Sequence, residues 1–282
     1  MSHLQAGKTA HTQARSLVCL LLCLLALVPA CAQDPTPTVE AIRFTVVVDT
    51  STAPLVDDLA SAYLAGRAHL SIQVEHAANT ERALETLTAG QADLASVSWL
   101  SEGASAPGQL WYRTVARDSL VLITHPSNPL GGLTLSQLRD IYQGKIFSWA
   151  DLGGPGLDIV PVSREEGSGT RLSFETLVMG GRDVAPMAVV MPSNRAVVDY
   201  VSTTPGGIGY VASAWLAPSV NLLAIEGVMP SPSSIETGRY LLARPFYLVA
   251  RFEPPGGLAE FIAWVAQGEG QEIVKRGYAL AP

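Results

Sequence analysis

Residues 42–63 read IRFTVVVDTSTAPLVDDLASAY, a β-branched run that passes directly into a helical pattern. The continuous apolar run at Ile42–Val48 favours a buried parallel strand, because both faces of such a strand are covered by other elements. Over Pro54–Ala65, apolar residues recur at the spacing of one helical face. This stretch therefore predicts a strand followed at once by a helix.

The same alternation continues along the chain. Leu70–Glu75 predicts a second strand, Glu81–Ala89 a second helix and Asp93–Val97 a third strand. This β-α-β-α-β order is typical of a parallel sheet with helices on both faces. A second αβ block follows, and the chain closes with a strand at Phe246–Ala250 and two helices. We therefore predict an α/β fold of two lobes, each a mostly parallel sheet flanked by helices, with a ligand crevice at the carboxyl ends of the strands.

Composition and the αβ pattern together divide the chain into four parts. We predict a signal peptide over residues 1–31, a tether over 32–40, a first lobe formed by 41–124 plus 213–282, and a second lobe formed by 125–212. The tether is polar and rich in proline, which is typical of an extended linker.

The first 31 residues have the composition of a targeting segment. Lys8 and Arg15 precede an apolar run at Leu17–Val28, which is shorter than the roughly 20 residues that cross a bilayer. This order predicts a secretory signal peptide. The Val-Pro-Ala-Cys sequence that ends at Cys31 also resembles the lipobox of bacterial lipoproteins. That resemblance implies a lipid anchor on Cys31, and ordinary secretory cleavage nearby is the alternative.

Charge and cysteine usage exclude several classes of function. The formal net charge is −7 at pH 7, which argues against nucleic acid as a partner because phosphate backbones require a basic surface. The chain has three cysteines, and all of them lie in the leader, so a disulfide scaffold is excluded. No cluster of histidines, cysteines or carboxylates has the spacing of metal ligands. We expect no metal and no cofactor.

The segment with the clearest chemistry is Ser163–Arg171, which reads SREEGSGTR. A predicted strand runs into a turn of Gly, Ser and Thr, and a helix starts at once. The first turn of a helix has unpaired N–H groups and a positive dipole end, so it binds anions readily. Gly169 allows close approach, Ser168 and Thr170 add hydroxyl donors, and Arg164 offers a planar pair of donors. The alternative is a capped helix after a flexible turn, with Arg164 paired to an acidic side chain.

The same segment resembles the signature of a known family. Residues 164–175 are similar to the signature of substrate-binding proteins of phosphate ABC transporters, which are PstS-like type II periplasmic binding proteins. Segments 141–146, 205–211 and 239–245 resemble further motifs of that family in the same order, so the resemblance spans nearly all of 41–282. It implies two lobes that close on a dehydrated oxyanion, held by hydrogen bonds at helix N-termini from both sides.

The resemblance implies site residues in both lobes. In the second lobe, the matching residues are Arg164, Ser168, Gly169 and Thr170. In the first lobe, the family uses small hydroxyl residues between the first strand and helix, where this chain has Asp49–Thr52. We favour Ser51 and Thr52 as ligands, although the absent family glycine leaves the register open and a plain hydroxyl helix cap is the alternative.

Two departures from the family pattern concern the choice of anion. The turn at His76–Thr80 replaces a Gly/Ser-rich turn, and Asn79 or Thr80 could donate there, while Thr80 is equally a helix cap. After the third strand, Ser98 is a candidate donor, and Trp99 replaces an arginine and is expected to pack at the cleft rim.

Monohydrogen phosphate carries a proton and therefore needs an acceptor in the site, whereas sulfate carries none. A buried donor left without an acceptor costs about 1–3 kcal/mol.

Either Asp49 or Glu166 could be that acceptor. The resemblance implies phosphate as the ligand, with molybdate, tungstate or sulfate as alternatives.

We predict a monomeric extracytoplasmic lipoprotein, anchored to the bacterial cell membrane and facing the periplasm or cell surface, that delivers inorganic phosphate to an ABC permease. A binding module for signalling without transport is the first alternative. A serine hydrolase is the second, but Ser168 lies outside a Gly-X-Ser-X-Gly elbow, and the histidines beyond the leader are only His69, His76 and His125. The chain is therefore not expected to be an enzyme.

Overall fold

The computed structural model describes residues 42–101 and 110–281. These residues belong to the compact unit Ala41–Pro282, and the predicted signal peptide, tether and lipidation site Cys31 lie outside them. None of the helices in the described ranges has both the length and the apolar character that a membrane span requires.

The first group of strands has β1 at its centre. The elements are β1 (Ile42–Val48), α2 (Ala53–Leu64), β2 (Leu70–His76), α3 (Thr80–Thr88) and β3 (Leu94–Val97). β1 pairs in parallel with β2 on one side and with β3 on the other. The predicted β-α-β-α-β unit is therefore confirmed.

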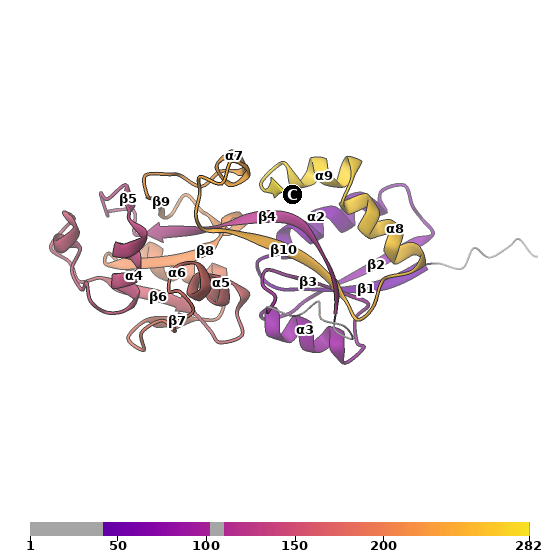
Figure 1. Ribbon diagram of the computed structural model, residues 1–282, viewed down its shortest axis with the longest axis horizontal. Coiled ribbons are helices and arrows are strands. Elements are labelled where there is room, and N and C mark those ends of the chain that lie inside the picture. The colour runs from indigo at the N-terminus through magenta and orange to yellow at the C-terminus, as the bar shows by residue number, and fades with distance from the viewer. Residues whose placement is uncertain (1–41, 102–109, 282) are drawn as a thin grey trace, which may run out of the picture. The chain divides into compact units, whose positions relative to one another are not determined.

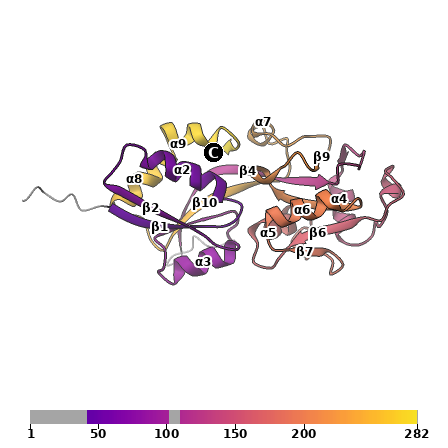
Figure 2. The same cartoon turned by 180° about the vertical axis from the view of Figure 1, so that it is seen from behind.

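The valines of β1 explain why both faces of this sheet are covered. Val46 and Val48 pack in one cluster with side chains of α2, α8 (Gly256–Val265) and α9 (Gly268–Val274). Val47 points to the opposite face and packs with residues of α3. Figure 1 and Figure 2 show α2, α8 and α9 on one side of these strands and α3 on the other.

Two long strands connect this group to a second one. β4 (Trp111–Thr124) and β10 (Ala243–Ala250) pair antiparallel, and β10 also pairs with β3. The sequence predicted only residues 119–124 of β4, because Arg113, Arg117 and Asp118 interrupt the apolar pattern before them. The strand order is β2-β1-β3-β10-β4-β8-β6-β7.

The second group continues the same sheet. It contains α4 (Leu135–Tyr142), β6 (Val160–Arg164), α5 (Gly169–Leu177), β7 (Val189–Met191), α6 (Asn194–Thr203) and β8 (Gly207–Ala212). β6 lies between β7 and β8 and is parallel to both. Shorter elements are β5 (Gly132–Leu133), η1 (Trp149–Leu152), η2 (Ser213–Trp215), β9 (Asn221–Ile225), α7 (Pro232–Glu236) and β11 (Ala279–Leu280).

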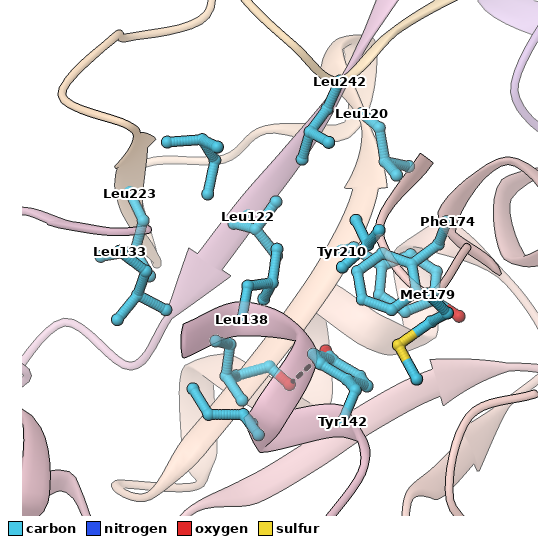
Figure 3. Packing of buried hydrophobic residues seen from close by; sticks show 14 of the residues in the cluster. Leu120, Leu122, Leu133, Leu138, Tyr142, Phe174, Met179, Tyr210, Leu223 and Leu242 are labelled. Carbon is cyan, nitrogen blue, oxygen red and sulfur yellow. Dashed lines mark hydrogen bonds between the residues drawn. The ribbon is translucent and has the colours of Figure 1, made fainter. Parts of the chain in front are cut away.

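An aromatic cluster holds α4 and α5 against β8. The rings of Phe174 and Tyr210 stack with their centroids 4.0 Å apart, and the Tyr142 ring packs beside Phe174 at 4.6 Å (Figure 3). The Tyr142 hydroxyl lies within hydrogen-bonding distance of the carbonyls of Val162 and Ile208. This packing holds α5 against the sheet and thereby places its N-terminus at the end of β6.

The predicted lobe boundaries at residues 124 and 213 stay a prediction. The strand pairings bear on two segments: Leu120–Thr124 of β4 pairs with β8, and β9 pairs with both β4 and β5. We therefore describe Leu120–Thr124 and β9 together with the second lobe. The two lobes are joined through β4 and β10.

Candidate oxyanion-binding site

The turn from β6 to α5 presents the start of a helix toward the first lobe. Ser168 caps α5 and its hydroxyl accepts from the N–H of Arg171 at 3.5 Å. Gly167 has a φ of 78°, a left-handed conformation that glycine adopts without strain. Ser168 and Thr170 are both about 1% exposed. The helix begins at Gly169, so the N–H groups of Gly169 and Thr170 belong to its unpaired first turn.

Arg164 ends β6, and its side chain is completely buried. Nε and Nη2 donate to the two carboxylate oxygens of Glu165 at 2.8 and 2.9 Å, and Nη2 lies 3.5 Å from the hydroxyl of Thr50. The third nitrogen, Nη1, is buried without a hydrogen-bond partner among the described residues. Buried polar atoms are rarely left unpaired, so this donor is suited to a ligand oxygen. The pairing with an acidic side chain is therefore present, but it leaves one donor of Arg164 free.

Asp49, directly after β1, organises the first-lobe side of the site. Its Oδ1 accepts from the N–H groups of Ser51 and Thr52 at 2.9 and 3.0 Å. Its Oδ2 accepts from the Ser98 N–H and hydroxyl at 2.9 and 2.8 Å, and from the Thr80 hydroxyl at 2.5 Å. The carboxylate is 2% exposed. One buried side chain therefore ties together the segments that follow β1, β2 and β3.

The predicted first-lobe residues have different surroundings. The Ser51 hydroxyl lies 2.8 Å from the Thr170 hydroxyl of the second lobe, so the structure brings these two together. The Thr52 hydroxyl lies 2.9 Å from the carbonyl of Ser96, and it makes no capping hydrogen bond to α2. The Ser98 hydroxyl donates to Asp49. Ser51 thus faces the second lobe, while the hydroxyls of Thr52 and Ser98 serve their own lobe.

Gly169 permits the close approach of the two lobes. A Cβ atom at this position would overlap the Thr80 hydroxyl and lie 2.5 Å from the Ser98 hydroxyl. Both of those hydroxyls are held by Asp49. A side chain at residue 169 would therefore push the start of α5 away from the first lobe.

Sequence reasoning placed Thr50 in the first-lobe cluster Asp49–Thr52 but missed its partners Asn194 and Trp215. The Thr50 hydroxyl accepts from Asn194 Nδ2 at 3.3 Å, and the Thr50 carbonyl accepts from Trp215 Nε1 at 2.9 Å. Asn194 is fully buried, and its Oδ1 accepts from the N–H of Ala212. The only local signal for Asn194 is its place after Ser193, which caps α6. Trp215 has no motif around it.

The alternatives that the sequence left open in this region are partly decided. Asn79 caps α3 by accepting from the N–H of Arg82 at 3.0 Å, while the Thr80 hydroxyl donates to Asp49. Glu166 is exposed, and Asp49 is therefore the carboxylate that lies within the site. Trp99 is half-buried and lines a cavity of about 390 Å³ beside β10. No group of three metal-binding side chains occurs in the described part of the chain.

Known proteins resemble this chain in sequence and in structure. The family model described as the PBP superfamily domain matches residues 32–269. The phosphate-binding protein PstS of Bacillus subtilis is 29% identical over 167 residues, which are 58% of this chain and 55% of that protein. PstS of Pseudomonas aeruginosa PAO1 is 28% identical over 244 residues, covering 76% and 75% of the two chains. The matched region thus spans little more than half of the Bacillus subtilis relative.

Two solved structures share the fold. A putative phosphate ABC transporter substrate-binding protein with bound phosphate from Clostridium perfringens has a TM-score of 0.79 and 28% identity, covering 85% of this chain and all of that one. An ABC-type phosphate transport receptor from Vibrio cholerae has a TM-score of 0.71 and 31% identity, covering 84% and 100%. These structures confirm the predicted periplasmic-binding-protein-like α/β fold. The chain therefore belongs to the PBP superfamily, and within it to the PstS-like family.

Proposed function

We propose that the chain captures inorganic phosphate between its two lobes and delivers it to an ABC importer. The observation that carries this proposal is the buried Nη1 of Arg164, which has no hydrogen-bond partner among the described residues and lies beside the first turn of α5. A planar cation and free N–H groups at a helix start are the donors that a tetrahedral oxyanion accepts from. The names of the relatives support phosphate as the ligand and an ABC transporter as the partner.

The proposed ligand-binding residues fall into two groups. The first group would donate directly to the anion and consists of Ser51, Arg164, Ser168, Gly169 and Thr170. The second group consists of Thr52 and Ser98, whose N–H groups donate to Asp49. They would act on the ligand through the position of that carboxylate.

Phosphate is favoured over sulfate by the presence of Asp49. The oxygens of Asp49 already accept hydrogen bonds, so a ligand that carries a proton would donate to Oδ2 in place of the Thr80 or Ser98 hydroxyl. Sulfate has no proton to donate, and the carboxylate would repel it. Glu166 was the other candidate acceptor, and its exposed side chain supports Asp49 instead. Molybdate, tungstate and sulfate have no comparable support from the described contacts.

We also propose that the protein is an extracytoplasmic monomer with a lipid anchor at Cys31 and no cofactor. The leader composition supports export, and the Val-Pro-Ala-Cys sequence supports lipidation to the bacterial cell membrane. The relatives are named as binding proteins and transport receptors, in agreement with a function that involves no catalysis. His76 and His125 hydrogen-bond to Asp57 and Ser127, and within the described residues the hydrogen bond of the Ser168 hydroxyl is with the N–H of Arg171.

A thermal-shift panel on the chain without residues 1–31 tests this function. The ligands are phosphate, sulfate, molybdate, tungstate and nitrate, each added at millimolar concentration. Because a ligand that binds only the folded state raises the Tm, phosphate should give the largest increase. No increase with any tetrahedral oxyanion would refute the proposed function. An equal increase with sulfate would refute the role of Asp49 while leaving oxyanion capture in place.

A further inference from the structure

A buried ion pair joins the two long strands that connect the lobes. Asp118 of β4 and Arg244 of β10 are directly opposite in the strand register. Arg244 donates from Nε and Nη2 to Oδ2 of Asp118 at 3.1 and 2.9 Å. The two side chains are 2% and 0% exposed, for Arg244 and Asp118 respectively. The pair is therefore shielded from solvent at the point where one lobe passes into the other.

Each partner of this pair makes further hydrogen bonds beyond the two strands. Oδ1 of Asp118 accepts from the N–H and the hydroxyl of Ser213 at 3.2 and 2.6 Å. Nη1 of Arg244 donates to the Thr170 hydroxyl at 3.3 Å. That hydroxyl lies 2.8 Å from the hydroxyl of Ser51 in the first lobe. A continuous set of hydrogen bonds thus runs from the connecting strands to both sides of the proposed anion site.

The chemistry of these groups sets the direction of the Thr170 hydroxyl. A guanidinium group can only donate, so Arg244 uses an acceptor position of the Thr170 oxygen. The single hydrogen of that hydroxyl then points away from Arg244, toward Ser51 or toward an anion in the cleft. Asp118 keeps the guanidinium in place, because both of its oxygens are hydrogen-bonded. The Thr170 hydroxyl is thereby prepared to act as a donor.

We propose that Arg244 is a positioning residue for anion binding, which orients the Thr170 hydroxyl as a donor and ties the start of α5 to the connecting strands. This inference rests on the proposed function. It also assigns a role to Arg244 in the segment 239–245. That segment resembles a family motif but contains none of the proposed ligand-binding residues. A purely structural role for the pair is the competing explanation. Burial raises the pKa of Asp118, and Arg244 and Ser213 act in the opposite direction by stabilising the charged carboxylate.

A double-mutant cycle separates the two explanations. The variants are Arg244→Lys, Thr170→Val and the combination of both. Lysine keeps the positive charge beside Asp118 but loses the planar group that reaches Thr170. The measurements are the Kd for inorganic phosphate by titration calorimetry and the Tm of each protein without ligand.

If Arg244 acts through Thr170, Arg244→Lys weakens phosphate binding about tenfold in the wild-type background, equivalent to about 1.4 kcal/mol. In the Thr170→Val background, the same change alters the Kd less than twofold, because the hydroxyl that it orients is gone. Arg244→Lys should lower the Tm in both backgrounds, because the buried pair with Asp118 is disturbed in each. An equal loss of affinity in both backgrounds would overturn the proposal and leave a structural ion pair.

Two further variants keep the test decisive. Asp118→Asn preserves the shape of the pair and is expected to show the same dependence on Thr170, so it replaces Arg244→Lys if that protein does not fold. Arg195→Lys changes an exposed i,i+4 pair with Asp199 and should leave the Kd within twofold. If the wild-type protein binds no tetrahedral oxyanion, the proposed function fails and the role of Arg244 fails with it. If it binds and the cycle is additive, only the role of Arg244 fails.

Discussion

The two sides of the proposed site are built on different principles. On the second-lobe side, the turn between β6 and α5 leaves donors free: the first-turn N–H groups of α5 and Nη1 of Arg164. On the first-lobe side, the turn between β1 and α2 uses its donors internally, because Asp49 accepts from the N–H groups of Ser51 and Thr52. We therefore expect the second lobe to contribute most of the binding energy. We expect the first lobe to select between anions.

The largest expected effect comes from removing the free donor of the second lobe. Arg164→Ala should weaken phosphate binding by about 100-fold or more, since hydrogen bonds to charged groups contribute about 1.5–3 kcal/mol each. The Tm increase with phosphate should disappear, and the Tm without ligand should also fall, because the buried pair with Glu165 is lost. Differential scanning fluorimetry and calorimetric titration measure both quantities. Arg195→Ala is the matched control at an exposed arginine, and phosphate affinity that survives Arg164→Ala would break the comparison.

The next effect concerns the carboxylate of the first lobe. Asp49→Asn keeps the shape of the side chain but replaces one acceptor with a donor, so at least one buried N–H or hydroxyl loses its partner. The free energy of unfolding should fall by about 1–3 kcal/mol in urea denaturation. The ratio of sulfate Kd to phosphate Kd should fall at the same time, because the proton acceptor is gone. Asp199→Asn on the exposed face of α6 should change the unfolding free energy by less than about 0.5 kcal/mol.

If Asp49→Asn changed neither the free energy of unfolding nor the ratio of the two Kd values, the carboxylate would neither stabilise the first-lobe side of the site nor select the anion. A stability loss without a change in the ratio would sharpen the comparison instead. In that case the first lobe supports the site but does not select the anion.

The smallest expected effect tests the support beneath Arg164. The Tyr210 hydroxyl lies 2.6 Å from the Ser163 hydroxyl and accepts from the N–H of Arg164. Burial raises the pKa of Tyr210 to about 12. The folded protein therefore holds this proton at pH values where the unfolded chain, with a pKa near 10, has lost it. The stabilising contribution of the hydroxyl is complete below pH 10 and decreases as the pH rises toward 12.

Tyr210→Phe should lower the free energy of unfolding by about 1 kcal/mol at pH 8. The difference from the wild-type protein should narrow between pH 10 and 12, since phenylalanine has no proton to lose and the other buried tyrosines are common to both proteins. Urea denaturation at a series of pH values measures this difference. A difference that stays constant up to pH 12 would show that Tyr210 does not titrate as its burial requires.

The sequence predicted the second-lobe side of the site more completely than the first. The donors of that side lie within the continuous segment Arg164–Thr170, and the turn and helix start that expose them are local features. The partners of Thr50 are Arg164, Asn194 and Trp215, which lie more than 100 residues away along the chain. Only the pairing of β4 with β8 and β10 brings such distant segments together.

The sequence by itself determined the αβ alternation and predicted a helix start suited to an anion at α5, because periodicity and turn composition are local properties. Only the tertiary structure decided which oxygens and nitrogens remain free. Asp49 is satisfied by donors from three segments, and Arg164 keeps one nitrogen unpaired although Glu165 holds the other two. Hydrogen-bond partners are often distant in the sequence and meet only in the folded chain. Whether a buried donor has an acceptor can therefore be judged only from the tertiary structure.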